Sequence, residues 1–141
     1  MTARLNPYLG FRADAREAME FYAHVFGGEP TFATFGELGM AGDPSVADRI
    51  MHAQLETPSG LLLMASDAMP DDTADVGEGS ISVSLSGGPE DEAELRGYWA
   101  NLVEGGTVTE PLVQAPWGDT FGMCTDRFGT RWLVNIGGAP G

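Results

Sequence analysis

The chain has 141 residues, and 43% of them are hydrophobic, which suits one globular domain with a buried core. Seven Lys and Arg residues against 21 Asp and Glu residues give a formal net charge of −14. Such a chain repels phosphate backbones and anionic membrane surfaces, so we expect no nucleic-acid and no membrane partner.

The first half of the chain predicts one βαβββ module over residues 5–66. A short strand at residues 6–11 precedes a helix that follows Asp14, which can cap it, with Glu17 in capping-box spacing. Gly27-Gly28 ends the helix. Three strands are predicted after it, separated by a loop and a turn: residues 29–35, 49–56 and 61–66. No apolar leader precedes the module, and we expect a cytoplasmic protein.

The second half predicts the same order of elements over residues 80–136, after an acidic linker at residues 67–79. Residues 80–86 alternate strictly, which indicates a half-buried strand with Ile81, Val83 and Leu85 on one face and four serines on the other. A helix starts near Pro89, with acidic side chains at the positive end of its dipole, and ends at Gly105-Gly106. The last three strands are predicted at residues 107–113, 120–125 and 130–136.

The two halves can be aligned by shared landmarks. Phe21 recurs as Trp99, Gly27-Gly28 as Gly105-Gly106, and Gly60 as Gly129. The offset is 78 residues at the helices and 69 residues at the turns, and the difference falls in the longer loop of the first half. Neither half can bury its sheet face alone, so we predict an α+β fold in which two βαβββ modules of one domain, residues 1–141, pair into a curved mixed sheet around a cleft.

A family resemblance is carried by the end of the chain. Residues 117–122, WGDTFG, followed by residues 125–132, TDRFGTRW, resemble the terminal β-hairpin of vicinal-oxygen-chelate proteins. Four further stretches are similar to the PhnB-like group of that superfamily: NPYLGF at 6–11, EFY at 20–22, HA at 52–53 and MASDAMP at 64–70. The resemblance implies a glyoxalase/bleomycin-resistance-like fold and a homodimer. The superfamily includes metal-dependent lyases, dioxygenases, thiol transferases and antibiotic-sequestering proteins.

The resemblance also implies where a metal would lie. Metal-using members hold the ion with His and Glu side chains, one on the first and one on the last strand of each module. Matching the strands places other residue types at these positions: Pro7, Met64, Ser80 and Leu133. A slip of one residue gives Tyr8, Leu63, Ile81 and Trp132 instead. None offers an imidazole, carboxylate or thiolate, so we predict no metal at the superfamily site.

A cofactor is not expected either. Some PhnB-like proteins are described as demethylubiquinone methyltransferases, and an S-adenosylmethionine site wants a glycine-rich turn between a strand and a helix. The glycine pairs of this chain follow helices, which is the wrong end for holding an anion.

Seven residues are candidates for ligand binding, from their strand or loop positions and from the resemblance: Tyr8, His52, Ser66, Asp67, Trp117, Asp119 and Asn135. His52 is either a satisfied structural histidine or a cleft-facing acid/base group, and it is the candidate catalytic residue if the protein is an enzyme. Ser66 and Asp67 either cap a turn or line the cleft mouth. Trp117 either fills core or walls a pocket, and Tyr8 either offers its phenol to the cleft or packs.

In the last predicted strand, alternating residues are expected to face the core and the cleft in turn. Trp132 is predicted in the core, with Asn135 and Arg131 on the opposite face, and Cys124 as a small buried hydrophobe. From these features we predict a metal-independent protein that binds a small molecule of unknown identity. Two alternatives stay open: a metal-dependent glyoxalase/dioxygenase-type enzyme (lyase, isomerase or thiol transferase) or antibiotic-sequestering resistance protein, and an interaction domain with a vestigial cleft.

Overall fold

The computed structural model describes residues 5–37, 39, 46–68 and 81–138. The chain divides into two compact units, Met1–Gly77 (unit 1) and Glu78–Gly141 (unit 2), and each is described by itself. The boundary lies in the predicted linker, of which residues 69–79 are outside the described residues, as is Ser80.

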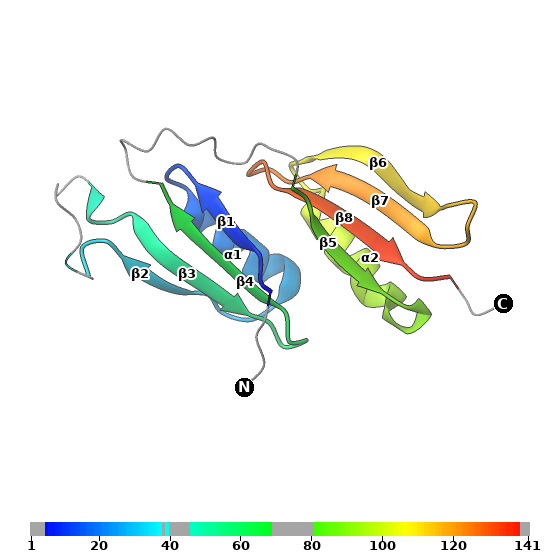
Figure 1. Ribbon diagram of the computed structural model, residues 1–141, viewed down its shortest axis with the longest axis horizontal. Helices are drawn as coiled ribbons and strands as arrows, with labels where there is room; N and C mark the ends of the chain where they lie inside the picture. Colours follow the sequence, from blue (N-terminus) through cyan, green and yellow to red (C-terminus); the bar gives the residue numbers. More distant parts are fainter. Residues whose placement is uncertain (1–4, 38, 40–45, 69–80, 139–141) are drawn as a thin grey trace. The chain divides into compact units, whose positions relative to one another are not determined.

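Unit 1 is a four-stranded mixed sheet with one helix against one of its faces (Figure 1). Its elements are β1 (Tyr8–Phe11), α1 (Ala15–Phe26), β2 (Thr31–Thr34), β3 (Ile50–Glu56) and β4 (Leu62–Asp67). The strand order is β1-β4-β3-β2, with β1 parallel to β4 and the other pairs antiparallel. α1 packs mainly on β3 and β4.

The core of unit 1 lies between α1 and the sheet. The buried side chains of α1 recur every three or four residues, as an amphipathic helix requires: Ala15, Ala18, Met19, Tyr22, Val25 and Phe26. They face alternate residues of the two central strands, Ala53, Leu55, Leu63 and Ala65, which are also buried.

The start of α1 differs from the sequence prediction. The Asp14 side chain makes no capping hydrogen bond, so the predicted cap is wrong. Instead the Ala15 N–H donates to Asp67 Oδ1 over 2.9 Å, and the Ile50 N–H donates to Asp67 Oδ2 over 2.9 Å. One buried carboxylate at the end of β4 therefore fixes the first turn of α1 and the start of β3.

Unit 2 repeats this arrangement (Figure 1). Its elements are β5 (Val83–Gly87), the 3-10 helix η2 (Pro89–Asp91), α2 (Glu92–Leu102), β6 (Thr107–Gln114), β7 (Thr120–Thr125) and β8 (Arg131–Ile136). The order β5-β8-β7-β6 has β5 parallel to β8 and the other pairs antiparallel. Leu95, Tyr98 and Leu102 of α2 pack toward Trp132 and Val134 of β8, and Cys124 is buried with them, as predicted.

The two units carry matching hydrogen bonds at equivalent turns. The Leu61 N–H donates to Thr57 Oγ1 over 3.0 Å, and the Thr130 N–H donates to Asp126 Oδ1 over 3.1 Å, at positions that differ by 69. Two mixed sheets, each carrying one helix, confirm the predicted α+β fold of two βαβββ modules.

Three strands are shorter than predicted by two or more residues: β1, β2 and β5. β5 begins at Val83, and Ile81 lies outside it with 83% of its surface exposed. The strand shortens because its partner ends: Val83 pairs with Trp132, near the first residue of β8. Among the described residues, no helix is long and apolar enough to cross a membrane.

Candidate functional site

Each sheet has one face under its helix and a second face that no helix of the same unit covers among the described residues. We call this second face the open face. On the open face of unit 1 lie Tyr8, Gly10, Ala33, His52, Gln54, Met64 and Ser66, which alternate with buried residues. On the open face of unit 2 lie Ser84, Ser86, Val113, Phe121, Met123, Arg131, Leu133 and Asn135.

Three predicted site residues come together on the open face of unit 1. The Tyr8 hydroxyl lies 3.3 Å from His52 Nδ1, and the two ring centroids are 5.8 Å apart. Ser66 lies between their strands, because the pairing of Ala53 with Ala65 brings Ser66 alongside His52. When the Tyr8 hydroxyl donates to Nδ1, the imidazole proton is on Nε2. Tyr8, His52 and Ser66 therefore form a small polar cluster with donors and acceptors.

Asp67, the next residue, lies on the other face of β4. Its side chain is buried, and both of its oxygens accept backbone N–H groups. These contacts are those of a structural carboxylate. Its predicted role in ligand binding has no contact in the structure that supports it.

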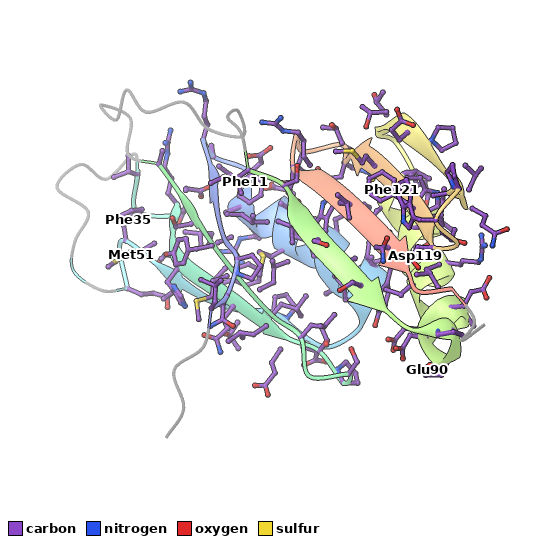
Figure 2. The ribbon with its side chains drawn as sticks, turned by 45° about the vertical axis from the view of Figure 1, so that its right-hand side comes forward. Phe11, Phe35, Met51, Glu90, Asp119 and Phe121 are labelled. Atoms are coloured by element: carbon purple, nitrogen blue, oxygen red, sulfur yellow. The ribbon has the colours of Figure 1, made fainter. Side chains whose placement is uncertain are left out.

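Three further predicted residues come together at one end of the sheet of unit 2. The Asn135 side-chain amide donates to Asp119 Oδ2 over 3.3 Å, and the Gly138 N–H donates to Asp119 Oδ1 over 3.0 Å. Trp117 is 68% exposed, so it is not a core residue, and it meets Phe121 edge to face with ring centroids 6.5 Å apart. Figure 2 shows Phe121 on β7 and Asp119 just ahead of it, beside the end of β8.

Phe121 was missed as a site residue by the sequence argument. Its signal was present, because Gly122 and Cys124 alternate with it and are buried, which turns Phe121 and Met123 toward the open face. Asn135 is its direct partner on β8. The candidate site of unit 2 therefore contains two aromatic rings, a carboxylate and an amide.

The open faces also test whether a superfamily metal fits. One ligand would come from each of β1, β4, β5 and β8. The side chains on the open face of these strands are Tyr8, Leu62, Met64, Ser66, Ser84, Ser86, Arg131, Leu133 and Asn135. They include no imidazole, carboxylate or thiolate, and the described residues contain no group of three or more His, Cys, Asp or Glu that could hold a metal. The residues do not fit a divalent cation at this site.

Comparison with known protein families assigns the chain to a family. A family model described as 3-demethylubiquinone-9 3-methyltransferase matches residues 3–135. The chain belongs to this family. Solved structures described as members of the glyoxalase/bleomycin resistance/dioxygenase superfamily share its fold, which confirms the predicted glyoxalase/bleomycin-resistance-like fold.

Similar proteins cover nearly the whole chain. Protein PA1353 from Pseudomonas aeruginosa is 37% identical, with a TM-score of 0.80, over 96% of this chain and 98% of that one. Protein YjdN of Escherichia coli K12 is 28% identical over 94% of each chain. A PhnB protein of Bacillus cereus, described as a putative 3-demethylubiquinone-9 3-methyltransferase, is 22% identical with a TM-score of 0.72, over 95% of this chain and 99% of that one, and shows the fold alone.

The family's methyltransferase description can be tested against the glycine-rich turn that a nucleotide-like cofactor needs. Within the described part of the chain, one such turn is formed by Gly87, the last residue of β5, and Gly88, which precedes η2, so the prediction that glycine pairs follow helices is wrong here. However, the Gly88 N–H donates to Asp91 Oδ2 over 3.1 Å. A side-chain carboxylate therefore occupies the position that a bound anion would take, and Glu90 and Glu92 add negative charge beside it. This turn does not fit S-adenosylmethionine.

A depression of about 330 Å³ lies beside the same turn, between the start of α2, the start of β7 and the ends of β6 and β8. Glu92, Arg96, Gln114 and Thr120 line it, and Arg96 Nε is 2.8 Å from Glu92 Oε2. None of the seven predicted site residues lines this depression.

Cys124 gives this family member a predicted pH dependence. Burial, and to a lesser extent the negative charge of Asp126, raises the pKa of the Cys124 thiol from 9.0 to about 11. The folded state keeps this proton longer than the unfolded state, so the stability associated with it is complete below pH 9 and is lost as the pH rises toward 11.

We expect the free energy of unfolding to fall by about 2–3 kcal/mol more in the natural protein than in Cys124→Ala over this range. The measurement is urea unfolding at several pH values between 8 and 11. The cavity left by Cys124→Ala lowers the free energy of unfolding by the same amount at every pH. The comparison therefore uses only how steeply the free energy of unfolding of each protein changes with pH. Parallel stability curves for the two proteins would contradict the prediction.

Proposed function

We propose that this protein binds a small organic molecule and does so without a metal at the superfamily site. The observation that carries the proposal is the chemistry of the open faces: the four strands that would supply metal ligands present thioether, alkyl, phenol, hydroxyl, amide and guanidinium groups instead. Such a mixture suits an organic ligand, because apolar side chains provide area and a few polar groups orient the molecule.

The two clusters define what the ligand would contact. In unit 1 the Tyr8–His52 pair and Ser66 supply hydrogen bonds, beside the apolar Met64. In unit 2, Trp117 and Phe121 supply aromatic surface beside Asp119 and Asn135. We also propose that the protein is a homodimer in solution and that it is cytoplasmic. The net charge of −14 argues against a nucleic-acid ligand, because such a chain repels phosphate groups.

Thermal unfolding tests the metal part of the proposal. The chelator-treated protein is heated alone and with Mg²⁺, Mn²⁺, Fe²⁺, Co²⁺, Ni²⁺ or Zn²⁺. Binding to the native state at a concentration of about 100 Kd adds about 2.7 kcal/mol, which is easily seen as a higher midpoint. We expect no metal to raise the midpoint. A rise with one metal that is reversed by chelation would overturn the metal-free proposal and direct work to lyase and dioxygenase substrates.

A second function is favoured by one observation, the contact between the Tyr8 hydroxyl and His52 Nδ1. An imidazole held by a phenol on an accessible strand face can act as a general base, and such a group contributes about 10²–10⁴-fold to a rate. Mass spectrometry of any bound compound separates the two functions. A binding protein returns the compound unchanged, whereas an enzyme returns a product and slows by at least about 100-fold in His52→Gln.

A further inference from the structure

We propose that the aromatic cluster of unit 2 selects an organic cation, that is, an ammonium or guanidinium group attached to an apolar body. The cluster consists of Trp117, Phe121, Asp119 and Asn135. This inference rests on the proposed function, since it names the charge class of the ligand. It is carried by the geometry of the cluster together with the charge of the chain.

Trp117 presents a large aromatic surface in a fixed place. It is 68% exposed, although it contacts Phe121 at a ring-centroid distance of 6.5 Å and an interplanar angle of 63°. An indole held by a neighbouring ring, with much of its π surface still in contact with solvent, is the best side-chain partner for a cation. Burying a ring of this size in the core would normally stabilise the protein, so its exposure at a loop is consistent with a binding role.

The turn that carries Trp117 is closed by hydrogen bonds. The Ala115 N–H donates to the Asp119 carbonyl oxygen over 2.6 Å, and the Gly118 N–H donates to the Ala115 carbonyl oxygen over 2.9 Å. The Gln114 side-chain amide donates to the Gly118 carbonyl oxygen over 3.2 Å, and Gly118 has a φ of 104°, which favours glycine. Little conformational freedom is left to be lost when a ligand binds to this turn.

Asp119 supplies a carboxylate two residues from the indole. Its two oxygens accept one hydrogen bond each, from Asn135 and Gly138, so each keeps a further lone pair for a ligand. These contacts fix the carboxylate without neutralising it, because both donors are uncharged amides.

The arginines of the described part of unit 2 do not neutralise Asp119 either. Arg96 is paired with Glu92, and Arg127 donates to the Glu104 carbonyl oxygen. Arg131 is on the same face of β8 as Asn135 but four residues along the strand, which is roughly 13 Å at the usual rise. The formal net charge of −14 adds a negative field that attracts cations and repels anions.

The test uses three probes of one shape and different charge: choline, the neutral 3,3-dimethylbutan-1-ol and the anionic 3,3-dimethylbutanoate. Saturation-transfer NMR on their methyl groups, with the full chain, measures binding without an assumed natural ligand. We expect choline to bind at least about fivefold better than the neutral alcohol, and the anion to bind least. We expect choline binding to fall about fivefold in Trp117→Leu and to fall less in Trp117→Phe, which keeps an aromatic face.

The carboxylate is tested with a matched charge control. Asp119→Asn and Glu94→Gln remove the same charge, but Glu94 lies on the exposed face of α2. We expect only Asp119→Asn to weaken choline binding, by about three- to fivefold, and less so at high salt. A thermal unfolding curve of Asp119→Asn close to that of the natural protein rules out a general loss of structure.

Three results would overturn the inference. Each of them can be told apart from a failure of the proposed function, which is small-molecule binding. Equal binding of choline and the neutral alcohol would refute the charge selection while supporting small-molecule binding. An equal effect of Glu94→Gln and Asp119→Asn would assign the preference to the overall field. Absence of choline binding would refute the cation site, and the proposed function would then be judged by the metal titration and by mass spectrometry, neither of which depends on Trp117.

Discussion

Replacement of Asp67 by Ala is expected to lower the free energy of unfolding of unit 1 by about 3–5 kcal/mol. The reason is that the carboxylate is buried and accepts the N–H groups of both Ala15 and Ile50. Removing it leaves two backbone donors without their partner in a place that water does not reach easily, and each such group costs about 1–3 kcal/mol. The measurement is hydrogen exchange of the amides of α1 and β3 together with urea unfolding followed by far-ultraviolet circular dichroism.

The tryptophans help to localise this effect. All three, Trp99, Trp117 and Trp132, belong to unit 2, so tryptophan fluorescence reports directly on unit 2. We expect Asp67→Ala to speed exchange in α1 much more than it changes the fluorescence. Ser66→Ala is the matched control, because the neighbouring hydroxyl lies on the open face and its loss should cost less than about 0.5 kcal/mol. Equal losses of stability in the two variants would contradict the structural role of Asp67.

The Asp67 carboxylate is an example of a contact that local sequence rules cannot predict. Asp14 precedes α1 with Glu17 three residues later, and this spacing predicts a cap at Asp14. The structure satisfies the first turn from Asp67 instead, 52 residues away from Ala15. Capping rules compare residues within one turn, and no local pattern records a contact of this length. The existence of the helix was therefore predictable, whereas the group that caps it was not.

The order of the elements was predictable because each has its own periodicity and its own stop signals. The glycine pairs after both helices and the turns before β4 and β8 repeat at fixed offsets, and the structure shows the same hydrogen bonds at both turns. The error at Ile81 has a physical cause. Its alternation with Val83 and Leu85 continues past the point where β8 can pair, so a correct pattern was extended over a residue with no strand beside it.

The candidate site was predicted in part for the same reason. Alternation predicted the face on which Asn135 lies, and the strand pairing agrees. Tyr8, His52 and Ser66 were candidates from their strand positions and the family resemblance, and the strand pairing places all three on one face of unit 1. The sequence does not show that the Tyr8 hydroxyl is within reach of His52, because that contact spans two strand neighbours and 44 residues.

Gly106→Ala is expected to lower the free energy of unfolding of unit 2 by about 3 kcal/mol or more. A Cβ atom at this position would overlap the Thr125 carbonyl oxygen and lie 2.9 Å from Asp126 Cα, so backbone and not a flexible side chain blocks it. Tryptophan fluorescence during urea unfolding measures the loss. Gly28→Ala is the equivalent change in unit 1, where the Cβ would lie 2.6 Å from the Glu56 carbonyl oxygen.

The same substitution at Gly97 is expected to raise the free energy of unfolding instead of lowering it. This glycine is on the exposed face of α2 with no atom within 4 Å of an added Cβ, so Gly97→Ala should raise stability by about 0.5–1 kcal/mol through helix propensity. If Gly106→Ala lowered stability no more than Gly97→Ala does, Gly106 could not lie as close to Thr125 and Asp126 as the structure shows.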